Sequence, residues 1–159
     1  MTRWKLYGFL LLTLASLLVY GFATEQSQTL DPKGLRDMLV QLGYEVKDLN
    51  TEVGKEKYSS DFKTTNLNIP VGFEISPSKN YVWLTVHLGP MPTDSPSMPL
   101  ELLKHNAKLQ PTFFYVTSKD NLMAALPVEN RGITNAVLKQ RVESLVNNVD
   151  TSRTVWQKQ

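Results

Sequence analysis

The sequence predicts an α+β domain in which an antiparallel sheet carries its helices on one face, with the element order α-β-β-β-α-β-β-α. Two observations lead to this prediction. Apolar residues recur at helical spacing in three separated segments, and runs of β-favouring residues lie close together between turn residues. Elements grouped in this way are typical of a layered α+β fold rather than of alternating parallel βαβ units.

The first half of the predicted domain contains one helix and three strands. Asp31 can cap a helix, Pro32 suits its first turn and Gly43 ends it, so this helix is predicted over residues 33–42. Residues 44–60 are charged and weakly patterned, and hold either a short strand or a loop. Three strands are then predicted over residues 61–68, 72–76 and 81–88, of which the last, YVWLTVHL, has the strongest pattern.

The second half begins with residues 90–99, PMPTDSPSMP, whose four prolines exclude both a helix and a central strand. We expect a crossover loop there. The remaining predicted elements are a helix over residues 99–110, a β-hairpin with strands over 112–117 and 121–126, a helix over 134–149, and a polar tail that carries Trp156.

Residues 1–23 have the layout of a secretory signal peptide. Met1 to Lys5 is a short basic segment, residues 6–23 carry no charged side chain, and Gly21-Phe22-Ala23 provides small residues for cleavage. The alternative is an uncleaved anchor, because the apolar stretch approaches the roughly 20 residues needed to span a bilayer.

Both interpretations place the rest of the chain outside the cytoplasm, in the periplasm or outside the cell. Residues 6–23 tether it to the membrane if they are not removed. Residues 24–30 are predicted to be a polar tether, and residues 31–156 to be a single domain.

Composition excludes several classes of function. The 17 basic residues include Arg3 and Lys5, so without the N-terminal segment the chain has 15 basic and 15 acidic residues. A domain without net charge lacks the basic surface of nucleic-acid-binding proteins, and no nucleic-acid partner is predicted. The absence of cysteine excludes disulfides, thiolate metal sites and a lipid-modified N-terminal cysteine.

The sequence contains no motif for catalysis or metal binding. His87 lies on the strongest predicted strand and His105 on the second predicted helix, and neither HExxH nor GxSxG occurs. A metal ion needs three or four converging ligands. We therefore predict no catalytic residue, no metal and no cofactor, and interpret both histidines as surface or packing residues.

Alternation along the strands divides the predicted sheet into two faces. The face toward the first and third helices is predicted to comprise Val82, Leu84, Val86, Phe114, Val116, Leu122 and Leu126. The opposite face carries Tyr81, Trp83, Phe113 and Tyr115. Exposed aromatic side chains of this size usually mark contact surfaces.

Leu100 and Leu103 of the second predicted helix also need a partner. If that helix or the proline-rich loop folds over the aromatic face, the face becomes a second small core. Otherwise the four aromatic residues and these two leucines are predicted to form a partner-binding surface. A homodimer formed by the second helix and the aromatic face would bury both groups.

Four segments resemble a known family: LRDMLVQLGY, GFEISPSKNYVWLTVHL, PLELLKHNAKLQPTFFYVT and NLMAALPVENRGITNAVLKQRVESLVNNVDTSRTVW. In this order they look like a YbjN-type domain over residues 31–156. That family shares the fold of type III secretion chaperones of the Tir-chaperone class. The resemblance implies a small, dimeric protein that holds another polypeptide and has no catalytic motif. Secretion chaperones act in the cytoplasm and are usually acidic, and the predicted export and neutral charge of this chain depart from that pattern.

Three functional hypotheses follow from the sequence. The first is an exported, non-enzymatic protein-binding or scaffolding domain with a polypeptide partner. The second is an unrecognised envelope hydrolase that uses His87 or His105 with a nearby acid. The third is a small-ligand carrier with a pocket between the sheet and the second helix.

Cleavage after Ala23 predicts that the protein recovered from outside the cytoplasm begins at Thr24. Mass spectrometry of the intact purified protein measures this directly. A mass that corresponds to an N-terminus at Met1 would show that residues 6–23 remain as an anchor.

Overall fold

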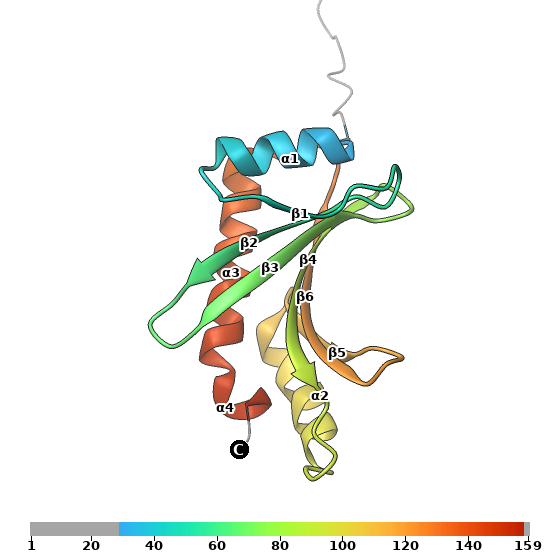
Figure 1. Ribbon diagram of the computed structural model, residues 1–159. Coiled ribbons are helices and arrows are strands. Elements are labelled where there is room, and N and C mark those ends of the chain that lie inside the picture. The colour runs from blue at the N-terminus through green and yellow to red at the C-terminus, as the bar shows by residue number, and fades with distance from the viewer. Residues whose placement is uncertain (1–28, 158–159) are drawn as a thin grey trace, which may run out of the picture.

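The computed structural model describes residues 29–157 (Figure 1). The predicted signal peptide or anchor and residues 24–28 of the predicted tether lie outside the described residues. The helices are α1 (Pro32–Gln41), α2 (Met98–Leu109), α3 (Asn135–Thr151) and α4 (Arg153–Trp156). The strands are β1 (Lys47–Asn50), β2 (Lys57–Lys63), β3 (Asn68–Ile75), β4 (Tyr81–Pro90), β5 (Phe113–Val116) and β6 (Asn121–Glu129). Within this part of the chain, no helix combines the length and the apolar character that crossing a membrane requires.

The six strands form one antiparallel sheet in the order β1-β2-β3-β4-β6-β5. This arrangement confirms the predicted α+β class and the order of elements along the chain. Two short elements add to it. Strand β1 lies in the segment for which a strand or a loop was expected, and α4 follows α3.

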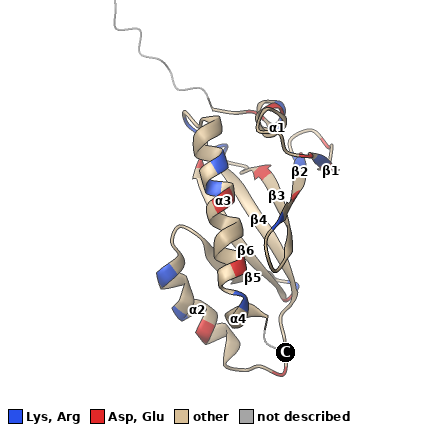
Figure 2. Ribbon diagram, turned by 90° about the vertical axis from the view of Figure 1, so that its left-hand side faces the viewer, with Lys and Arg blue, Asp and Glu red and all other residues tan. Residues whose placement is uncertain are grey.

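Helices α1, α2 and α3 lie on the same side of the sheet (Figures 1 and 2). Each helix buries one apolar stripe there, as expected for amphipathic helices on a sheet. The buried stripes are Leu35 and Leu39 of α1, Met98, Leu102 and Leu109 of α2, and Leu138, Val142, Leu145 and Val149 of α3.

Strand β4 supplies the centre of the core. Val82, Leu84 and Val86 are fully buried, and so are the residues of β6 that pair with them. Burial of one such side chain stabilises a fold by about 1.5–3 kcal/mol. The side chains between them point to the other face, so β4 separates a packed side from a side on which the described part of the chain places no helix.

The strand predicted over residues 61–68 was placed wrongly. Strand β2 ends at Lys63 and β3 begins at Asn68, with a turn between them. In this turn the hydroxyl oxygen of Thr64 accepts hydrogen bonds from the backbone N–H groups of Asn66 (3.2 Å) and Leu67 (2.9 Å). Such bonds from a threonine side chain to its own loop favour a turn over a strand.

The structure also corrects the expected position of Val116. This residue was predicted to face the core, but it is 43% exposed. It is the last residue of β5, which lies at the edge of the sheet and therefore has a neighbouring strand on one side only. The other residues predicted to face the core are buried.

Helix α2 does not form a second core with the aromatic face. Leu102 and Leu109 are buried on the same side as α3. Met91 of the proline-rich loop packs against that core as well. Within residues 29–157, the alternative in which this helix or this loop covers the aromatic residues is therefore wrong.

The segment predicted as a polar tail is helical. Helix α3 continues to Thr151 and α4 follows it. The indole N–H of Trp156 donates a hydrogen bond to the carbonyl of Val149 at 2.8 Å, and the hydroxyl of buried Ser152 lies 2.9 Å from Nε2 of His105. These contacts tie the C-terminal end of α3 to α2.

One buried side chain fixes the segment that precedes α1. Asn130 follows β6 and is fully buried. Its Oδ1 accepts the N–H of Leu30 at 3.0 Å, and its Nδ2 donates to the carbonyls of Leu30 (3.0 Å) and Lys79 (2.9 Å). The chain is thus attached to the end of the sheet before its first helix begins.

Replacement of this side chain is expected to destabilise the fold. Asn130→Ala removes three part-buried hydrogen bonds to the backbone of Leu30 and Lys79 and should lower the free energy of unfolding by about 1–3 kcal/mol. Asn66→Ala removes a hydrogen bond between the exposed side chains of Asn66 and Asp150 and should change it by no more than about 0.5 kcal/mol. Urea denaturation of both variants measures this difference, and equal losses would contradict the proposed attachment.

Candidate functional site

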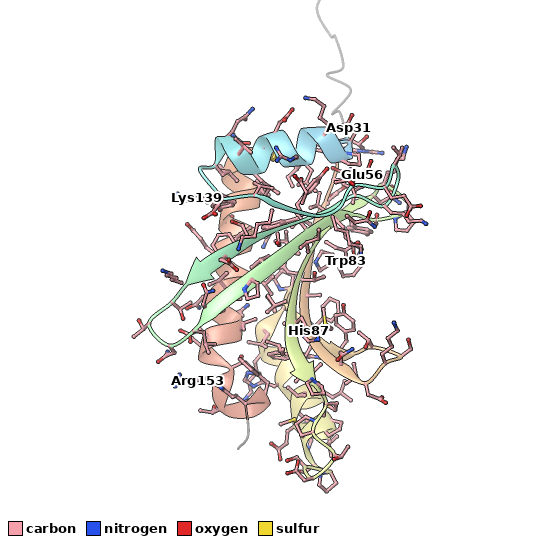
Figure 3. All side chains as sticks on the ribbon, viewed as in Figure 1. Asp31, Glu56, Trp83, His87, Lys139 and Arg153 are labelled. Carbon is pink, nitrogen blue, oxygen red and sulfur yellow. The ribbon has the colours of Figure 1, made fainter. Side chains whose placement is uncertain are left out.

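The face of the sheet opposite the helices is called the uncovered face here. No helix packs on it within the described residues. Trp83 lies on this side of the sheet, away from Lys139 of α3 (Figure 3). One cross-strand row on it comprises Lys57, Glu74, Trp83 and Pro127, a second Ser59, Gly72, Thr85, Ala125 and Phe113, and a third His87, Met123 and Tyr115.

Three aromatic rings stand together on the uncovered face. The rings of Trp83 and Phe113 meet edge to face with their centroids 6.2 Å apart, and the centroid of Tyr115 lies 5.9 Å from that of Phe113. Edge-to-face pairs stabilise each other by about 0.5–1.5 kcal/mol beyond the area that they bury. The three rings therefore hold one another in place, and the pairing of β4 and β5 with β6 brings them together.

These rings form one wall of a groove of about 670 Å³, called the aromatic groove here. Its opposite wall is the loop between β1 and β2, with Gly54, Lys55 and Glu56. Between the two walls, Lys57 and Glu74 form a salt bridge. The groove thus combines an apolar wall with a charged one, as sites that bind amphipathic segments do.

Tyr115 has a polar end within this groove. Burial raises the pKa of its phenol above the usual value, and the carboxylate of Glu74 raises it further. The hydroxyl is therefore protonated at physiological pH and can donate and accept hydrogen bonds. A side chain with an aromatic ring and a polar hydroxyl suits a surface that is exposed to water in the free protein and buried in a complex.

The outer edge of β5 is partly closed by α2. The side-chain amide of Asn106 accepts the N–H of Phe114 at 2.8 Å and donates to the carbonyl of the same residue at 3.1 Å. Asn106 thereby takes the place of a neighbouring strand at this position. An edge strand satisfied by a side chain resists indiscriminate pairing with other strands.

Beyond the start of β5, the edge of β6 is closed differently. Along β6 the backbone N–H and C=O groups of successive residues point alternately toward β4 and toward the β5 side. The backbone of Pro127 points toward the β5 side. Because β5 pairs only with the residues up to Ala125, Pro127 lies on an unpaired stretch of this edge. Proline has no N–H group, so it costs no ladder hydrogen bond there and offers no donor to a foreign strand.

Helix α2 continues the apolar surface around the edge of β5. Leu103 is 68% exposed and lines two hollows, one of about 210 Å³ beside Tyr115 and one of about 840 Å³ beside Phe113. Both aromatic residues also line the aromatic groove. The three hollows are therefore parts of one surface that bends around β5, called the β5 belt here.

The structure brings four of the six predicted contact residues together. Trp83, Phe113, Tyr115 and Leu103 line the β5 belt. Tyr81 (45% exposed) and Leu100 (55% exposed) face solvent but line none of the three hollows. Whether any of the six binds a partner stays a prediction.

Sequence analysis missed the polar members of this surface. Asn106 and Lys57 lie in segments whose patterns were used only to place elements, and their contacts depend on how α2 and β2 fold onto distant strands. The strand predicted over residues 121–126 extends to Glu129 in the structure, so the position of Pro127 inside a strand, which indicates a sheet edge, was not recognised.

The two histidines are not brought together. His87 is exposed on the uncovered face, whereas His105 lies on the helix side beside Ser152. Among residues 29–157 no group of three or more histidine and acidic side chains is placed to hold a metal ion. Two hollows lie between the sheet and α2, where a small-ligand pocket was predicted: one of about 210 Å³, and one of about 840 Å³ that is within the roughly 300–1,000 Å³ typical of ligand sites.

Comparison with solved structures identifies the fold. A chain in the crystal structure of the ExsC–ExsE complex matches with a TM-score of 0.56 and 10% sequence identity, covering 81% of this chain and 97% of that one. A chain of the heterodimeric ExoU–SpcU complex from the type III secretion system of Pseudomonas aeruginosa matches with a TM-score of 0.47 and 15% identity, covering 76% and 96%.

The chain therefore shares its fold with the matching chain of the ExsC–ExsE complex. At this level of identity the similarity describes the fold alone. No protein-family model matches the sequence, and no curated protein matches it either.

Proposed function

We propose that this protein is a non-enzymatic binding protein that holds a segment of another polypeptide along the β5 belt. The observation that carries the proposal is the continuous surface of half-exposed aromatic and leucine side chains around an edge strand, on a sheet whose other face is covered by the helices of residues 29–157. Tryptophan and tyrosine are the residue types most often found at energetic centres of protein interfaces.

The fold supports a polypeptide rather than a small molecule as the ligand. The ExsC–ExsE structure with the same fold is a complex of two polypeptides. The hollows of the belt are open surface grooves joined by shared residues, which suits an extended segment. An apolar belt that stays exposed on a monomer is uncommon, since large exposed patches generally mark contact sites.

We also propose that the domain acts outside the cytoplasm. The support is the basic, then apolar, then small-residue pattern of residues 1–23. A second copy of the chain is one further polypeptide that the belt could hold, as the resemblance to a dimeric family implies.

A photo-reactive amino acid placed in the belt tests this function. Introduced at Tyr115 or Leu103 in the protein expressed in its native cells, it should form a covalent adduct with a polypeptide, because both side chains line the proposed contact surface. The same amino acid at Val137, which is 38% exposed on α3, serves as the matched control and should give no such adduct. Mass spectrometry of the adducts identifies the partner and distinguishes a second copy from another protein.

The substitution Trp83→Ser, combined with the photo-reactive amino acid at Leu103, should lower the yield of the adduct. Loss of a central aromatic contact typically costs about 2 kcal/mol or more of binding free energy, which is about thirtyfold in affinity. Equal adduct yields at Tyr115, Leu103 and Val137 would contradict the proposal.

A further inference from the structure

The largest of the three hollows contains a charged group that has no partner. This hollow, of about 840 Å³, lies between the C-terminal half of α2, the start of β5 and helix α3, and among the described residues Arg141 is the one charged residue that lines it. Within residues 29–157, the guanidinium of Arg141 makes no ion pair and no hydrogen bond. Six other basic residues of this part of the chain form an ion pair with an acidic side chain: Lys33, Arg36, Lys47, Lys55, Lys57 and Lys139.

The position of Arg141 follows from the periodicity of α3. It precedes Asn148 by seven residues, which is two helical turns, so both lie on the stripe of α3 that faces the end of α2. Asn148 uses this position to donate hydrogen bonds to the carbonyl of Leu109 (3.4 Å) and the hydroxyl of Thr112 (2.9 Å). The carbonyl of Leu109 also accepts the N–H of Thr112 at 3.0 Å, so local groups occupy the last carbonyl of α2.

The wall of the hollow leaves the charge of Arg141 uncompensated. Among the described residues no acidic side chain lines it, and the rest of its wall consists of apolar and neutral side chains such as Leu103, Phe113 and Pro127. Lys104 and Lys108 lie on α2 next to lining residues, and Figure 2 shows both basic and acidic residues on the two helices. An arginine in a groove with apolar walls attracts a carboxylate more strongly than one surrounded by water, because the lower local dielectric strengthens the interaction.

We infer that Arg141 is an anchor for a carboxylate, and that the polypeptide held by the β5 belt presents an aspartate or glutamate side chain flanked by apolar residues. This inference rests on the proposed function and names the chemistry of its partner. The carboxylate belongs to a side chain rather than to a chain end, because the hollow continues through Phe113 into the aromatic groove and through Leu103 toward Tyr115. A segment that occupies the belt passes this hollow.

Selection from a phage-displayed library of random linear peptides tests the inference. The bait is the protein purified from cells that express the full chain. Peptides recovered on it should be enriched in an acidic residue between apolar residues. For a synthetic peptide of this kind with an amidated C-terminus, replacement of the acidic residue by its amide should weaken binding about tenfold or more. Arg141→Gln should weaken binding of the original peptide by a similar factor.

The decisive result is the double change. If the acidic residue of the peptide contacts Arg141, replacing that residue should change the affinity for the Arg141→Gln variant very little. The Arg141→Lys variant, which keeps the positive charge, should bind the original peptide more tightly than Arg141→Gln and less tightly than the unaltered protein. Lys139→Gln, which removes a basic residue on the same helix outside the hollow, should leave affinity unchanged. Thermal melting confirms that each variant is folded.

Three outcomes would overturn the inference. Recovery of peptides that depend on Trp83 and Tyr115 but not on Arg141 would refute the carboxylate anchor and leave the proposed function standing. Loss of binding on amidation of the C-terminus would show that a chain end is recognised instead. Recovery of no peptide that depends on any residue of the belt would refute the proposed function together with this inference.

Discussion

Strands β4 and β6 pair through the middle of the sheet, and the rest of the structure is arranged about the alternation of their side chains. Val82, Leu84 and Val86 of β4 are fully buried against the helices, and the residues between them include Trp83 on the opposite face. A register shift of one residue would exchange the two sets and place rings of Trp and Tyr size where valine fits. The separation of a packed side from an aromatic side therefore depends on this one pairing.

The helices follow from that constraint. The loop after β4 leads into α2, and α3 follows β6 and packs on it. The apolar stripes of α2 and α3 therefore lie on the same face of the sheet. The buried Asn130 adds the N-terminal segment to the same end of the sheet. No helix within residues 29–157 covers the other face, and in our proposal a partner covers the aromatic cluster there.

The edge at β5 shows how such a domain limits what it binds. Asn106 satisfies the outward backbone groups of Phe114, and Pro127 removes a donor from the stretch of β6 that has no neighbour. Indiscriminate strand addition is discouraged, while the side chains beside these positions stay exposed. Recognition then depends on aromatic contacts and, in our proposal, on the charge of Arg141, which together provide more specificity than backbone pairing alone.

Local patterns were sufficient for most of the fold and for part of the site. The alternation of YVWLTVHL and the helical spacing of Leu138 and Val142 placed their elements and the faces that they bury. The start of β2 was missed because Tyr58 stands in a charged segment whose burial depends on α1 and β3. Val116 was misassigned because its exposure depends on where the sheet ends. The roles of Arg141 and Asn106 could not be predicted, because they depend on contacts between helices and strands that are distant in the sequence.

The central claim is that the aromatic side of the sheet and the outer side of α2 are exposed in the folded chain and are covered only by a partner. Thiol reactivity measures this directly, because the natural chain contains no cysteine. In the isolated monomer, the account predicts that Tyr115→Cys and Leu103→Cys react as readily as Val137→Cys. The adjacent buried positions, Phe114→Cys and Leu102→Cys, should react only after denaturation. Protection of positions 115 and 103 equal to that of 114 and 102 in the monomer would contradict it.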